Sequence, residues 1–195
     1  MKGPKGYDVT LFAAPPDASY VTCLAAAPNG EVFIGIDKDG SLGHDPNAGK
    51  VVRAVDTDGD GKADKFTTFA VMDHPRGLIW DDGKLYVLHP PFLGVFEDKG
   101  DGTAGPEKIL IDGISTPSLV QQRGADHTTN GIRMGIDGWI YIAMGDFGAL
   151  KLPAPMAKRS RNTAAESCAS APTAPISKST ATAIATSTTS PSTRS

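Results

Sequence analysis

A strand-turn-strand pattern recurs three times in this chain. Each copy is an apolar run, an Asn-Gly or Asp-Gly dipeptide and a second apolar run. The copies occupy residues 23–36, 77–89 and 131–144. These dipeptides supply the positive φ angles of a tight turn between antiparallel strands. The turn glycines Gly30, Gly83 and Gly138 are 53 and 55 residues apart, so the pattern predicts three β-hairpins at a regular interval.

A second strand-turn-strand unit, with an acidic glycine-containing turn, follows each of the first two hairpins, at 49–70 and 93–113. Short strands repeating at about 50 residues are typical of β-propeller blades. No segment keeps apolar residues at helical spacing over three turns. We therefore expect an all-β chain that forms an incomplete β-propeller, about three blades of an expected six. Three coincidental hairpins in a sandwich are the alternative.

The composition changes near Lys151. From Ala164 to Ser195, 26 of the 32 residues are Ala, Ser, Thr or Pro, which cannot build a core. We expect a partial propeller over 7–150 and a low-complexity, disordered tail over 151–195. Most codons for these residues carry C at the second base, so the tail fits a one-base frameshift in a GC-rich gene. A linker or glycosylated stalk is the alternative.

Charge and composition exclude several classes of partner. The formal net charge of −3 provides no basic face, so we expect no nucleic-acid partner. No apolar run approaches the length of a membrane span, and the first residues lack the core of a secretory signal. Cys23 and Cys168 are too far apart to indicate a disulfide framework or a thiolate metal site.

The acidic turn at 56–64 is a candidate metal site. Its sequence, DTDGDGKAD, places four carboxylates around two glycines, at Asp56, Asp58, Asp60 and Asp64. Clustered carboxylate oxygens on a loop suit calcium. The first half matches an EF-hand loop, but the twelfth position is Thr67 in place of a bidentate Glu. A solvated acidic turn is the alternative.

His127 is the candidate catalytic residue. It follows Asp126 on a polar loop just before a predicted strand. A histidine with a carboxylate partner can act as a general base near neutral pH. The other histidines, His44, His74 and His89, lie beside Pro, Gly or Asp, where a structural or solvent-exposed role is expected.

The stretch ADHTTNGIRMGIDGWIYIAMGDFG, residues 125–148, resembles soluble quinoprotein glucose dehydrogenases and the wider glucose/sorbosone dehydrogenase family. Residues 7–150 more specifically resemble the planctomycete-type membrane-bound dehydrogenase domain. This resemblance implies a parent protein that oxidises a sugar or another alcohol with pyrroloquinoline quinone (PQQ). It makes His127 the base and Asp126 its orienting partner. It also implies a periplasmic or cell-envelope location and, often, a haem c domain, although this chain has no CxxCH.

As a truncated member of these propellers, this chain is expected to be inactive, and it departs from the family pattern at two places. Pro75 stands where the sugar dehydrogenases have Gln. The quinone-contacting Arg-Asn of the family appears only if the frame is restored; here those codons are read within Thr182 to Thr186. Arg76 and Arg133 remain possible pocket cations. The alternatives are a noncatalytic propeller that binds or scaffolds in the cell envelope, and a calcium-binding structural fragment.

Overall fold

The computed structural model describes residues 3–125, 127–145, 148 and 182–187, the last of these as backbone only. Blade 1 consists of β1 (Val21–Ala26), β2 (Val32–Asp37), β3 (Gly49–Val55) and β4 (Lys65–Met72). Blade 2 consists of β5 (Gly77–Asp81), β6 (Lys84–His89), β7 (Phe92–Glu97) and β8 (Lys108–Asp112). Blade 3 consists of β9 (Thr129–Met134), β10 (Trp139–Met144) and β11 (Thr182–Ser187).

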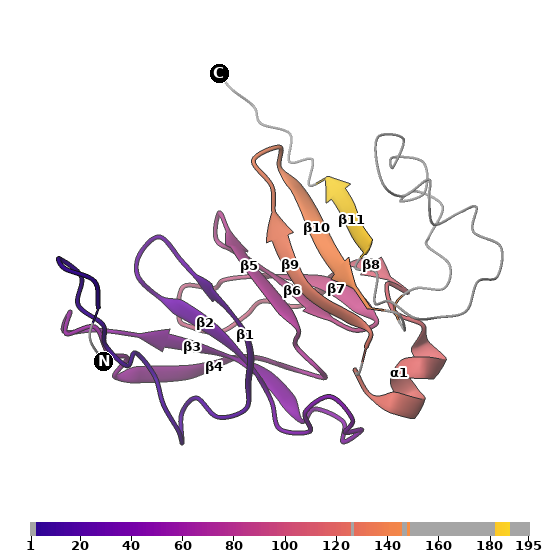
Figure 1. The fold of residues 1–195 in the computed structure, drawn as a ribbon, viewed down its shortest axis with the longest axis horizontal. Coiled ribbons are helices and arrows are strands. Elements are labelled where there is room, and N and C mark those ends of the chain that lie inside the picture. Colours follow the sequence, from indigo (N-terminus) through magenta and orange to yellow (C-terminus); the bar gives the residue numbers. More distant parts are fainter. Residues whose placement is uncertain (1–2, 126, 146–147, 149–181, 188–195) are drawn as a thin grey trace.

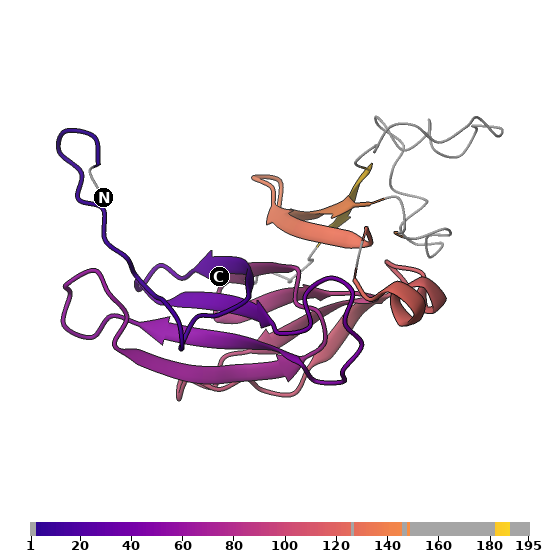
Figure 2. The same ribbon diagram turned by 60° about the horizontal axis from the view of Figure 1, so that its bottom comes forward.

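Each blade is an antiparallel sheet whose strands follow sequence order. The three hairpins predicted from the sequence are β1–β2, β5–β6 and β9–β10, and their turn glycines Gly30, Gly83 and Gly138 all have positive φ, at 90°, 72° and 76°. The first strands of the blades lie side by side, β1 against β5 and β5 against β9. Figure 1 shows the blades following one another, and Figure 2 shows blade 1 next to blade 2. The predicted all-β, blade-like fold is confirmed.

Two elements were not expected from the sequence. The helix α1 (Pro117–Arg123) lies between β8 and β9, with a proline in its first turn. Strand β11 pairs with β10 although it belongs to the predicted disordered tail; its alternating Thr and Ile residues favour a strand, and β10 offers it an edge. The rest of the predicted tail lies outside the described residues. Among those that are described, no helix is long and apolar enough to cross a membrane.

Alternating side chains place two apolar layers on blade 1. Because neighbouring residues of a strand point to opposite faces, Phe33 belongs to the cluster between blades 1 and 2, whereas Ile34 belongs to a cluster on the far face of blade 1. A third cluster, with Leu88 and Ile140, lies between blades 2 and 3. This alternation stacks the blades face to face, as a propeller requires.

The far face of blade 1 is covered by the preceding chain, residues 10–18, which we call the cover segment. Phe12, Ala13 and Ala18 pack on Ile34 and its neighbours. The backbone N–H of Ala63 donates to the carbonyl of Phe12, with 2.8 Å between N and O. One of the faces that an open arc would leave bare is therefore shielded within the chain.

Phe33 holds the contact between the first two blades. It is fully buried, with its ring centroid 4.8 Å from that of Trp80 and 5.0 Å from that of Phe69. We predict that Phe33→Ala lowers the free energy of unfolding by about 3–5 kcal/mol, because it leaves a cavity in this layer. Urea denaturation measures this. Leu24→Ala, on exposed β1, should change it by less than about 1 kcal/mol; equal losses would contradict this assignment.

Candidate functional site

The connections between strands lie at two opposite ends of the blades. In an antiparallel sheet, the β1–β2 and β3–β4 turns share one end, here called the turn face, and the β2–β3 and β4–β5 loops share the other, here called the loop face. The acidic turn at 56–64 lies on the turn face, because it joins β3 to β4. His127 precedes β9 and lies on the loop face. The two predicted sites therefore do not form one site.

A buried ion network lies on the loop face. The Asp37 carboxylate, with a side chain that is 0% exposed, ends β2. Its Oδ2 is 2.7 Å from Nη2 of Arg76 and 3.1 Å from Nδ1 of His74. Its Oδ1 accepts the backbone N–H of Asp39 at 3.1 Å. Burying a carboxylate is costly unless it is paired and hydrogen-bonded, and here both conditions are met.

The β4–β5 loop around this network connects all three blades. The carbonyl of Pro75 accepts the hydroxyl of Thr22 from β1 at 2.6 Å. The backbone N–H of Arg76 donates to Leu88 of β6 at 2.8 Å, and its carbonyl accepts the N–H of Gly131 of β9 at 3.1 Å. The Arg76 side chain also donates to the carbonyl of Gly40. Arg76 is thus held in place as a structural cation.

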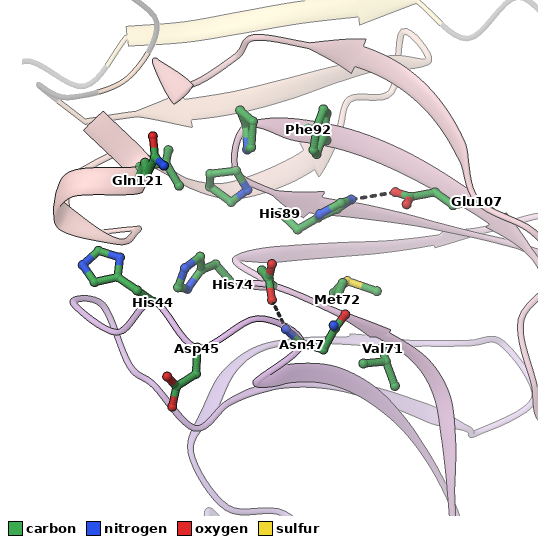
Figure 3. Close-up of a pocket in the computed structure, with 14 residues that line it drawn as sticks. His44, Asp45, Asn47, Val71, Met72, His74, His89, Phe92, Glu107 and Gln121 are labelled. Carbon is green, nitrogen blue, oxygen red and sulfur yellow. Dashed lines mark hydrogen bonds and ion pairs between the residues drawn. The ribbon is translucent and has the colours of Figure 1, made fainter. Parts of the chain in front are cut away.

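A second histidine pair lies next to this network. Nε2 of His89, at the end of β6, is 2.6 Å from Oε1 of Glu107. Together with His74 and the exposed His44, it lines a cavity of about 420 Å³ between blades 1 and 2, the interblade cavity (Figure 3). His74 and His89 are paired with carboxylates and His44 is exposed, which fits the structural or solvent-exposed roles expected from the sequence. The sequence did not indicate that the three histidines share a cavity.

The predicted base, His127, is exposed on the loop face, and its predicted partner Asp126 lies outside the described residues. Buried threonines follow it: Thr128 donates its hydroxyl to Ala125, and Thr129 lies 3.0 Å from the Ser115 hydroxyl. Gly145, at the end of β10, packs against the His127 backbone so closely that a Cβ there would collide with the carbonyl oxygen. Two parts of the stretch that carries the resemblance are therefore in contact.

Asp73-His74 repeats Asp126-His127 one blade earlier. Both pairs precede the first strand of a blade, and both histidines have positive φ, 47° for His74 and 52° for His127. Such backbone conformations are uncommon for residues other than glycine. When the hairpins are aligned by Gly77 and Gly131, the two Asp-His pairs are offset by one residue, so the repeat is not visible in an alignment without a gap.

The acidic turn brings three of its four predicted ligands together. Carboxylate oxygens of Asp56, Asp58 and Asp64 lie within 4.8 Å of one another. Asp60 is not in this group, and its carboxylate is 3.1 Å from Nζ of Lys62. Thr67 lies within β4, so the turn joins two strands and lacks the second helix of an EF-hand.

Backbone N–H groups hydrogen-bond both oxygens of the first carboxylate. The N–H of Gly61, followed by that of Gly59, donates to Asp56 and lowers the pKa of its carboxyl below the usual Asp range. Asp64 accepts both the N–H and the hydroxyl of Thr57. The turn is therefore shaped and ionised by its own hydrogen bonds.

A second cavity, of about 560 Å³, is lined by the first strands of all three blades, with Arg76 and Arg133 in its wall. Arg76 is engaged by Asp37, whereas Arg133 is exposed on β9. Burial raises the pKa of the Cys23 thiol to about 11, so this wall residue is not a thiolate at neutral pH. A quinone with three carboxylates needs several cationic partners, so the described residues alone do not fit it.

The chain is similar to one family of domains and to a solved structure. The family model described as "Domain of unknown function (DUF7133)" matches residues 1–189. A solved structure from Thermus thermophilus, described as a candidate oxidoreductase (glucose dehydrogenase), is similar with a TM-score of 0.46 at 17% identity. The similarity covers 65% of this chain and 37% of that one, so the chain spans little more than a third of its length. The comparison with curated proteins gave no match.

The buried network on the loop face yields a stability prediction. Asp37→Asn removes the charge that Arg76 faces, and we expect it to lower the free energy of unfolding by about 3 kcal/mol, because breaking a buried pair leaves an uncompensated charge. Urea denaturation monitored by tryptophan fluorescence measures this. Asp8→Asn, at an exposed position, should change it by less than about 0.5 kcal/mol. A similar small change for both variants would mean that the network does not hold the blades.

Proposed function

The chain belongs to the DUF7133 family of domains of unknown function, and we propose that it supplies three blades of a propeller that oxidises a sugar or another alcohol. The observation that carries this proposal is the loop face, where His127 is exposed on a loop held by Gly145 and by buried threonines. Loops that converge on one end of a rigid β scaffold are where catalytic residues are commonly found.

In this proposal, His127 removes the proton of a substrate hydroxyl. The backbone that follows His127 is held by the hydrogen bonds of Thr128 with Ala125 and Gly145, so the imidazole can meet a substrate without a large loss of loop entropy. Asp126 is proposed as its orienting carboxylate. In the whole protein, PQQ would supply the hydride acceptor when bound.

The described residues alone do not fit that quinone, because Arg76 is engaged by Asp37 and Arg133 is a single exposed cation. The other cations would come from other blades of a complete ring. We therefore expect no turnover from this chain by itself, and titration with PQQ should produce no saturable fluorescence change. A haem c domain in the same parent is a proposed electron acceptor.

A noncatalytic propeller that binds or scaffolds is the second candidate, and one observation favours it. Pro75, at the position of the family's Gln, is packed as a structural residue: a Cβ on Gly49 would lie 2.6 Å from its Cδ. Failure of a complete propeller containing these blades to bind PQQ would support this candidate over the enzyme.

The role of His127 can be tested in such a complete propeller. We predict that His127→Ala lowers kcat by about 10²- to 10⁴-fold, the usual contribution of a general base, and that added imidazole restores part of the rate. Steady-state kinetics measure both. Lys38→Ala, also exposed on the loop face, should leave kcat within about 2-fold. An unchanged rate in His127→Ala would remove this residue from the proposed role.

We further propose that Asp56, Asp58 and Asp64 bind calcium on the turn face, as a structural ion. Their oxygens converge within reach of one cation, and carboxylate oxygens are the ligands that calcium prefers. The lowered pKa of Asp56 keeps this carboxyl charged as the pH falls, until it drops through that lowered value.

Calcium titration followed by calorimetry tests the proposal. We predict a Kd of about 10⁻⁴ to 10⁻³ M, the range of weak calcium sites. Asp56→Asn or Asp64→Asn should weaken binding by at least about 10-fold, because each removes a charged ligand. Asp60→Asn, whose carboxylate pairs with Lys62, should change the Kd by less than about 2-fold. No heat of binding, or equal effects at Asp60 and Asp56, would contradict this assignment.

A further inference from the structure

The interblade cavity lies outside the roles assigned so far. Its walls come from the β2–β3, β4–β5, β6–β7 and β7–β8 connections, from the adjoining ends of β4 and β7, and from α1, so segments of two blades and a helix surround it (Figure 3). Its volume of about 420 Å³ is within the range of small-molecule sites. We propose that this cavity binds a neutral polyhydroxylated molecule of about the size of a monosaccharide. The proposal does not rest on His127, on the quinone or on calcium.

The imidazole rings of His74 and His89 are each held by a carboxylate. Nδ1 of His74 faces Asp37 at 3.1 Å, so Nε2, on the opposite side of the ring, faces away from that carboxylate. Nε2 of His89 faces Glu107 at 2.6 Å, which leaves Nδ1 as its other polar atom. A second partner that holds a histidine ring fixes its orientation, and groups held in place before binding lose little entropy when a ligand arrives.

The remaining lining is partly polar and partly apolar. Its carboxylates are those of Asp45, Asp73 and Glu107. Asp73 accepts the N–H of Asn47, and Glu107 faces His89. Carboxylate oxygens can accept hydrogen bonds from sugar hydroxyls.

Gln121 of α1 and Asn47 of the β2–β3 loop carry amides that donate and accept, as a hydroxyl does. Phe92, Pro91 and Met72 provide apolar surface beside them, against which the C–H face of a sugar ring can pack. A ligand with alternating hydroxyl and C–H groups satisfies both kinds of wall.

Other classes of ligand fit less well. Neither Lys nor Arg lines the cavity, so a phosphate or carboxylate would find no fixed cation. Its histidines and carboxylates do not come together as metal ligands either; among the described residues, the group that does so is the aspartate triad on the turn face.

Gly94 of β7 makes the position of Glu107 possible. A Cβ on Gly94 would collide with the Glu107 carboxylate, so Gly94→Ala should push this carboxylate away from His89. Gly94 is not among the lining residues, whereas Glu107 is, so this variant moves a lining side chain without substituting it.

The test is a titration of the full 195-residue chain, without quinone or calcium, with D-glucose, D-galactose, D-mannose and glycerol, following the histidine side-chain NMR signals. We expect saturable shifts of the His74 and His89 signals with at least one sugar. The double variant His44→Ala/Gln121→Ala, at two exposed positions, should raise the Kd by about 5-fold for each lost hydrogen bond. Gly94→Ala should also raise it, and Lys38→Ala should not.

Three results would overturn the proposal. The first is that none of the four polyols gives a saturable shift. The second is that the double variant and Gly94→Ala both bind as tightly as the original chain. The third is that sodium acetate or methylammonium chloride shifts the same signals and displaces the sugar. Near-UV circular dichroism of each variant confirms that its fold is intact. Because no redox reaction is measured, loss of the dehydrogenase hypothesis would leave this result unchanged.

Discussion

The buried contact between Asp37 and Arg76 fixes the geometry of the loop face. Asp37 ends the second strand of blade 1, and Arg76 directly precedes blade 2, so the contact joins two sheets where their loops meet. A buried charge has few acceptable positions, because it must keep its partner. The backbone around Arg76 also reaches Leu88 and Gly131, so the position of the loop is transmitted to blade 3. The placing of His74, and with it the interblade cavity, follows from this contact.

Local turn chemistry explains why so much of the fold could be predicted. Gly30, Gly83 and Gly138 each need positive φ, and the apolar runs on either side of them alternate, so each hairpin is encoded within about 14 residues. Strand β11 and helix α1 were missed for a different reason. The first depends on an edge that β10 offers to a distant segment, and the second is too short to show a helical period over three turns.

The candidate site was predictable in its parts and not in its arrangement. The spacing of the acidic turn indicated a cluster, and three of its aspartates do converge, but the pairing of Asp60 with Lys62 depends on side-chain directions that spacing does not encode. Asp37 has no motif around it and is recognisable only through its partners, 37 and 39 residues away in the chain. The opposite placing of His127 and the acidic turn follows from strand order, which the predicted blades already contained.

The cover segment has a consequence for how such a ring could be assembled. In a complete ring, a neighbouring blade would meet the face of blade 1 on which Phe12 and Ala13 pack, so the cover segment would lie between the two sheets. This peptide precedes β1 in the chain and leaves the ribosome before it. The apolar far face of blade 1 therefore has a cover that is synthesised before the strands of the blade itself.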